Sequence, residues 1–134
     1  MAHTFRLHPE HSLAIVCFDG VVDDTEAIAA TGEVALDPDW APGGAVVWDG
    51  RRVMRTVGTL APETDAGIAA AGGPLDQYLG AGRSAALLRP GADPETVLLL
   101  GGLGWAHPGR EVRTFYDPYE AARWLGVPPH ILRC

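Results

Sequence analysis

The sequence has no lysine and no asparagine, and all ten of its basic residues are arginine. Without lysine, the chain cannot use Schiff-base chemistry or the phosphate-binding lysine of a Walker A loop. Without asparagine, it has no acceptor for N-linked glycosylation. The only two cysteines, Cys17 and Cys134, lack the spacing of metal ligands, so we expect two reduced thiols, with Cys17 in the core.

Long apolar runs and an excess of positive charge are missing too. The longest apolar stretch, 97–103, is too short to cross a bilayer, and no apolar segment of a signal peptide follows the first residues. The formal net charge is −7, which disfavours nucleic acid as a partner because phosphate contacts need a basic surface. We therefore expect a cytoplasmic protein with no nucleic-acid partner and no membrane insertion.

The chain length indicates a single domain, 1–134. Isoleucine, leucine, valine and phenylalanine total 32 residues, which is enough for one hydrophobic core. Glycine and proline together total 28 residues, so we expect many short turns between regular elements.

Apolar runs alternate with helix signals along the chain, which is typical of an α/β fold. The best helix start is Asp117-Pro118, an acidic cap followed by proline, with Glu120 three residues after the cap. We predict a mixed, mostly parallel sheet of about five strands with an N-terminal hairpin and flanking helices. The predicted strands are 4–8, 13–18, 45–48, 84–88 and 112–116. The predicted helices run from 23–25 to about 34, from 59 to about 71, from 94 to about 103, and from 118 to 125. The segment 51–58 is predicted to be a loop or a short helical turn.

Two glycine-rich segments and a pair of histidines resemble cofactor-binding or metal-binding motifs, but their positions in the chain favour turns and a helix end instead. The segment 80–85 matches a dinucleotide fingerprint, but it precedes a strand instead of opening a helix, so we predict a turn. The segment 101–104 is expected to end its helix or to allow close packing. His8 and His11 flank the hairpin turn without a third ligand nearby. We therefore expect no cofactor and no metal.

The candidate binding residues follow the strand at 45–48. Asp49 lies just after its carboxyl end, where open α/β sheets bind ligands, and Arg51, Arg52 and Arg55 form a basic cluster beside it. Such a cluster suits an anion or the carboxylate of a partner. The alternative is a solvated loop whose arginines pair with local acidic residues. Trp105, in a glycine-rich stretch, is the tryptophan that we expect to line a cavity.

Three segments, together with the element order, resemble the STAS domain, the fold of bacterial anti-sigma-factor antagonists. More specifically, the chain resembles the small stand-alone SpoIIAA-like proteins of the STAS/SEC14 type, and the resemblance spans nearly the whole chain. Segment 11–20 resembles the family's second strand and the glycine after it, 46–51 its central strand, and 113–126 its final strand and helix.

The resemblance implies a non-catalytic regulatory domain that binds a partner protein. In this family the binding surface is the loop and helix start after the central strand, and phosphorylation of a serine or threonine there acts as a switch. Thr56 and Thr59 are the hydroxyl residues at that place in this chain, where the family's Asp-Ser-Ser-Gly-like motif is absent.

Two other functions stay open on sequence grounds. One is a small-molecule or lipid-binding module with a pocket under the segment 97–105. The other is an enzyme, for which the sequence offers no nucleophile–base pair, metal set or cofactor loop. A homodimer through the short N-terminal edge strand is a further expectation.

Overall fold

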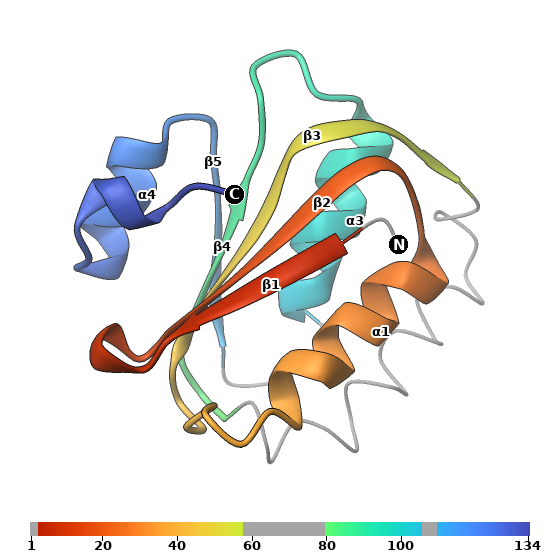
Figure 1. Ribbon diagram of the computed structural model, residues 1–134. Coiled ribbons are helices and arrows are strands. Elements are labelled where there is room, and N and C mark those ends of the chain that lie inside the picture. Colours follow the sequence, from red (N-terminus) through yellow and green to blue (C-terminus); the bar gives the residue numbers. More distant parts are fainter. Residues whose placement is uncertain (1–2, 58–79, 106–109) are drawn as a thin grey trace.

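A computed structural model describes residues 3–57, 80–105 and 110–134 of the chain. Its centre is a five-stranded sheet in the order β1-β2-β3-β4-β5, in which β1 is antiparallel to β2 and the other pairs are parallel (Figure 1). The predicted α/β fold class with a leading hairpin is therefore confirmed. The strands are β1 His3–His8, β2 Leu13–Asp23, β3 Ala45–Val57, β4 Arg83–Leu87 and β5 Glu111–Phe115.

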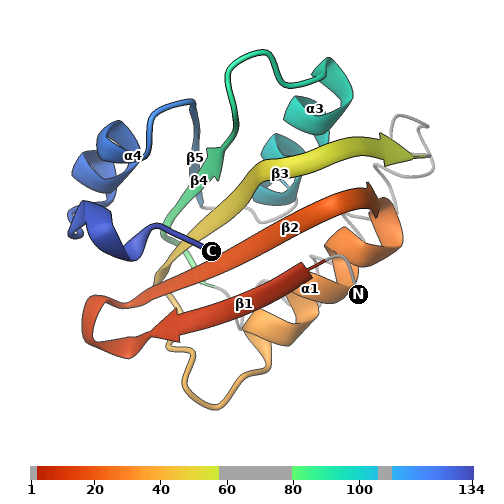
Figure 2. The ribbon, with the colours of Figure 1, turned by 45° about the horizontal axis from the view of Figure 1, so that its top comes forward.

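Helices cover both faces of the sheet. α1 and α3 lie on one face, and α4 lies on the other together with the C-terminal segment (Figures 1 and 2). No helix of the described residues is long and apolar enough to span a membrane. The helices are α1 Asp24–Ala35, α3 Pro94–Trp105 and α4 Pro118–Leu125, with 3-10 turns η1 Pro9–His11 and η2 Pro129–Ile131. The helix predicted for 59–71 lies outside the described residues.

Local capping explains where α1 and α4 begin. The Asp23 carboxylate accepts a hydrogen bond from the Glu26 amide at 2.8 Å, and the Asp117 carboxylate accepts one from the Tyr119 amide at 2.9 Å. Each carboxylate satisfies an otherwise unpaired amide of the first helical turn. α4 ends at Gly126, whose φ of 74° is the left-handed geometry that glycine adopts without strain. Both predicted helix starts are confirmed.

The core consists of two layers because the strands alternate their side chains between the faces. Val46 and Trp48 of β3 face α1 and α3, and Val47 faces α4 and η2. The layer under α4 also holds Ala121 and Ala122 of that helix. A sheet covered on both faces needs nearly continuous apolar strands, which is the pattern that the runs 13–18 and 45–48 show.

The predicted ends of β2 and β3 were wrong. Asp19-Gly20 and Asp49-Gly50 have turn-forming composition, yet β2 continues to Asp23 and β3 continues to Val57. The two strands pair with each other over this whole length, with register shifts that absorb the irregular residues. Gly20 has a φ of 76°, a conformation that a glycine supplies inside a bulged ladder. The segment 51–57 is therefore a strand and not a loop.

The end of α3 also differs from the prediction. Gly101 was expected to begin the breakdown of the helix, but α3 continues to Trp105. The helix packs closely on β3 at the position of Gly50, which has no side chain. A Cβ added at Gly50 would lie only 2.3 Å from Cδ1 of Leu100, a fully buried residue of α3. Burial of its apolar side against the sheet outweighs the poor helix propensity of glycine.

Two glycine-to-alanine substitutions are expected to have opposite effects. A Cβ at Gly82 would lie 2.7 Å from the Gly43 carbonyl oxygen and 2.8 Å from that of Gly44, so Gly82→Ala should lower the unfolding free energy by about 2 kcal/mol. A Cβ at Gly101 meets nothing within 4 Å, so Gly101→Ala should raise it by about 0.5–1 kcal/mol. Urea unfolding of both variants tests the pair, and a neutral Gly82→Ala would contradict the close approach.

Candidate functional site

An irregularity in β3 places two arginines on one side of the sheet. Cys17 of β2 pairs with Asp49, but Asp19 pairs with Arg52, so β3 has one extra residue between these positions. A bulge of this kind turns consecutive side chains to the same side. Arg51 and Arg52 consequently line the same surface hollow, on the face of the sheet that α4 and the C-terminal segment cover.

Asp49 is a buried carboxylate held by Arg51. Its residue is 2 % exposed, and its Oδ2 lies 2.7 Å from Nη2 of Arg51. Nε of Arg51 donates to Oδ1 at 3.1 Å, and the Arg51 amide donates to the same oxygen at 3.0 Å. Arg51 Nη2 also donates to the Leu132 carbonyl oxygen at 3.0 Å, which ties the C-terminal segment to β3. This pair positions the segment and neutralises both charges.

Cys17 and Cys134 form a disulfide, so the expectation of two reduced thiols was wrong. The cysteines are 117 residues apart in sequence, and the fold joins them because α4 and η2 return the C-terminal segment to β2 (Figures 1 and 2). Cys17 is 8 % exposed and belongs to the α4-side core layer, whereas Cys134 is exposed. No local pattern near either cysteine indicates this pairing.

Two surface hollows meet at Cys134. The first, which we call the arginine hollow, has a volume of about 300 Å³ and is lined by Asp49, Arg51, Arg52, Arg133 and Cys134. Since the side chains of Asp49 and Arg51 neutralise each other, the side chains of Arg52 and Arg133 contribute two positive charges to the arginine hollow, in a chain whose side chains sum to −7. The second, of about 200 Å³, is lined by His3, Thr4, Cys17, Phe18, Asp19, Arg52 and Cys134.

The site suits an anion better than a cation. Cys17, Asp49 and Cys134 are residue types that ligate metals, and their donor atoms lie within 4.8 Å of one another. Sulfurs bonded to each other are not thiolates, however, and metal ligation needs the thiolate. Arg51 already contacts both carboxylate oxygens of Asp49, and Arg52 and Arg133 add positive charge. A carboxylate or phosphate group matches this donor set.

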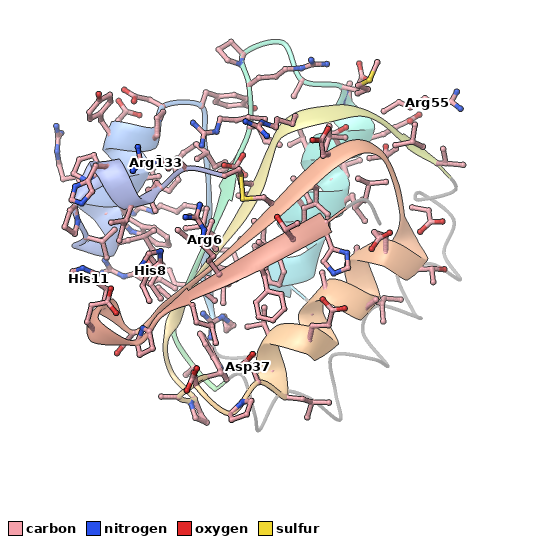
Figure 3. The ribbon with its side chains drawn as sticks, viewed as in Figure 1. Arg6, His8, His11, Asp37, Arg55 and Arg133 are labelled. Atoms are coloured by element: carbon pink, nitrogen blue, oxygen red, sulfur yellow. A yellow bond between two sulfur atoms is a disulfide. The ribbon has the colours of Figure 1, made fainter. Side chains whose placement is uncertain are left out.

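The other predicted site residues lie elsewhere. Arg55 is exposed near the end of β3, far from Arg133 and the C-terminal segment (Figure 3). Thr56 is 7 % exposed, so its hydroxyl is not accessible for phosphorylation while β3 is intact. Thr59 and the side chain of Trp105 lie outside the described residues. The structure thus brings together Asp49, Arg51 and Arg52 and separates them from Arg55 and Thr56.

His3, beside the second hollow, is a buried histidine between two carboxylates. Its Nδ1 contacts Glu26, and its Nε2 lies 2.6 Å from Oε2 of Glu33. Burial lowers the pKa of His3, but the hydrogen bonds and charges of Glu33 and Glu26 outweigh it, so the pKa is raised above the ordinary 6.5. Both glutamates belong to α1, so this cluster joins β1 to that helix.

The raised pKa predicts a pH-dependent stability. The folded state holds the His3 proton more tightly than the unfolded chain, so this contribution is complete below about pH 6.5 and is lost as the pH rises through the folded pKa. The difference in unfolding free energy between wild type and His3→Gln should therefore shrink from pH 6 to pH 8.5. When Glu26→Gln and Glu33→Gln are introduced into both proteins, the effect of His3→Gln on the unfolding free energy should no longer depend on pH. A difference that grows with pH would contradict the prediction.

Sequence reasoning missed the residues that hold the site together. Arg133 and Cys134 carry no local signal, and their role depends on where η2 returns the chain. Arg110 is a buried arginine that donates to the carbonyl oxygens of Gly80, Arg83 and Gly44 and to the Ser84 hydroxyl. No sequence pattern singles out Arg110, because burial of an arginine is visible only in the folded chain.

No protein-family model matches this chain, and no curated protein is significantly similar to it in sequence.

Proposed function

We propose that this chain is a non-catalytic regulatory domain that binds a partner protein, and that the arginine hollow recognises an anionic group of that partner. The observation that carries the proposal is the excess of two guanidinium charges, Arg52 and Arg133, in an otherwise acidic chain. Both residues are exposed, so a carboxylate or phosphate group reaches them without unfolding the core. The resemblance to SpoIIAA-like STAS proteins supports a regulatory rather than an enzymatic role.

The proposed surface differs from the one that the resemblance alone implies. Instead of a loop and the helix start after the central strand, it uses the α4-side face of β3 and the C-terminal segment. Asp49 and Arg51 contribute by positioning this segment, through the hydrogen bond from Arg51 to the Leu132 carbonyl oxygen. Substitution of Asp49 would leave Arg51 without its carboxylate, so Arg52 and Arg133 are the better residues to test.

Loss of the two exposed arginines should weaken binding of an acidic peptide. The probe is a fluorescein-labelled peptide of four glutamates around one phosphoserine, measured by fluorescence anisotropy at low salt. We expect the Arg52→Gln, Arg133→Gln double variant to raise the Kd about tenfold, since two exposed charge pairs contribute about 1–2 kcal/mol together.

A matched control removes two arginines outside the site. Arg89 and Arg123 are exposed, and neither lines the arginine hollow, so Arg89→Gln, Arg123→Gln makes the same change in net charge. This control should bind like wild type. Equal Kd values for the two double variants would contradict the arginine hollow as the binding site.

The alternative of a lipid-binding pocket under 97–105 has less support. Leu99 and Leu100 of α3 are 3 % and 0 % exposed and pack into the core layer. Neither of the two hollows described above is lined by a residue of α3. A natural ligand that co-purifies with the protein and is released by Leu100→Trp would favour this function instead.

The cytoplasmic location and the homodimer remain parts of the proposal. Disulfides persist mainly in oxidising compartments, and in the cytoplasm they usually belong to redox-responsive sites. The Cys17–Cys134 disulfide is therefore compatible with a cytoplasmic protein if the bond responds to thiols. β1 lies at one edge of the sheet, which leaves the side of β1 away from β2 as the candidate dimer contact.

A further inference from the structure

The disulfide lies at the junction of the two hollows, and its two ends differ in accessibility. Cys134 is exposed and lines both hollows, whereas Cys17 is 8 % exposed within the core layer under α4. A thiolate that approaches from solvent therefore meets the sulfur of Cys134 first. Thiol–disulfide exchange depends on which sulfur the attacking thiolate can reach.

The surroundings of Cys134 favour a negatively charged thiol. Arg52 and Arg133 line the arginine hollow beside it, and within the described residues neither side chain makes a hydrogen bond or an ion pair. Asp49, whose Oδ2 lies 3.3 Å from Sγ of Cys134, is neutralised by Arg51, and the Asp19 side chain lines the second hollow. Positive charge at the mouth of a site raises the local concentration of anions and accelerates their encounter.

We propose that Cys134 is a thiol–disulfide exchange site for a small thiol that carries carboxylate groups. The thiolate of that molecule attacks Sγ of Cys134 and forms a mixed disulfide with it. The bond between Cys134 and Cys17 breaks, the electron pair leaves on Sγ of Cys17, and this sulfur takes a proton from water. One disulfide is exchanged for another, and Arg52 and Arg133 hold the carboxylates in the arginine hollow.

This exchange shares the arginines of the proposed function but does not depend on it. A free carboxylated thiol needs only the sulfur of Cys134, which lines both hollows, and the two guanidinium groups, whereas partner binding needs a larger complementary surface. Peptide binding that fails while thiol selectivity holds overturns the proposed function alone, and the reverse result overturns the exchange site alone.

The test uses the full chain in its disulfide form and reduced glutathione as the anionic probe. Iodoacetamide in excess traps the thiol that is released, and mass spectrometry of peptides identifies both modified cysteines. We expect glutathione on Cys134 and carbamidomethyl on Cys17. The rate per thiolate should be about tenfold higher for glutathione than for neutral 2-mercaptoethanol, and 1 M NaCl should remove most of this preference.

Two variants separate charge steering from simple access. Arg52→Gln, Arg133→Gln should bring the rate ratio of glutathione to 2-mercaptoethanol close to one, because the rate for the more highly charged glutathione thiolate should fall further than the rate for the 2-mercaptoethanol thiolate. Arg89→Gln, Arg123→Gln should keep the wild-type ratio. Glutathione attached to Cys17, a ratio near one in wild type, or two free thiols that persist when the reduced chain is incubated with oxidised glutathione would each overturn the proposal.

Discussion

Reduction of the Cys17–Cys134 disulfide is expected to lower the free energy of unfolding by about 4 kcal/mol. The bond closes a loop between residues 117 positions apart, which spans most of the chain. In the chain-entropy account, such a crosslink restricts the unfolded state, and a loop of roughly 100 residues corresponds to about 4.7 kcal/mol. The bond also holds the C-terminal segment on β2, so its loss should expose the core layer under α4.

The measurement is urea unfolding of wild type with and without a reducing phosphine. The Cys17→Ser, Cys134→Ser variant provides the control, because it should match reduced wild type to within about 1 kcal/mol and should not respond to the phosphine. A wild-type midpoint that is unchanged by reduction would contradict the expected contribution of this crosslink to stability.

Arg110→Met is expected to destabilise the protein by about 3–4 kcal/mol. Arg110 is 9 % exposed, and its guanidinium donates to three main-chain carbonyl oxygens, at 2.8 Å to Gly80, 2.9 Å to Arg83 and 2.7 Å to Gly44. Its Nε also donates to the fully buried Ser84 hydroxyl at 2.9 Å. These acceptors belong to or adjoin the starts of β3 and β4, and Arg110 immediately precedes β5. Methionine fills a similar volume but leaves these acceptors without their donors.

Two further variants test whether the effect is specific to the hydrogen bonds of Arg110: a conservative substitution at the same position, and removal of an exposed arginine elsewhere. Arg110→Lys keeps the charge but loses the planar set of donors, so we expect an intermediate loss of about 2 kcal/mol. Arg89→Met removes an exposed arginine and should change the stability by less than about 0.5 kcal/mol. Chemical unfolding of the three variants checks the order. A loss below about 1 kcal/mol for Arg110→Met would contradict a structural role for this network.

The fold class and the helix starts follow from signals within a few residues of each other. The Asp23 cap, the Asp117-Pro118 start of α4 and the Gly126 end were all readable because the groups that interact are neighbours in sequence. The apolar runs likewise predicted the presence of β2, β3 and β4. The candidate site was partly predictable for the same reason, since Asp49, Arg51 and Arg52 are neighbours on one strand.

Long-range pairing accounts for what local patterns missed. β2 and β3 continue past Asp19-Gly20 and Asp49-Gly50 because each strand supplies hydrogen-bonding partners for the other, and bulges absorb the register shifts. The local composition at these positions favours turns. The strands continue there because their pairing with each other stabilises the extended conformation more than the local composition disfavours it.

The remaining parts of the site depend on where the chain returns after β5. Cys134 reaches Cys17, and Leu132 reaches Arg51, because α4 and η2 carry the C-terminal segment back over the sheet. Arg110 contacts the regions where β3 and β4 begin because the strands are parallel and their amino ends meet at one edge. Composition and spacing determine which elements form, whereas the packing of distant segments determines which side chains meet.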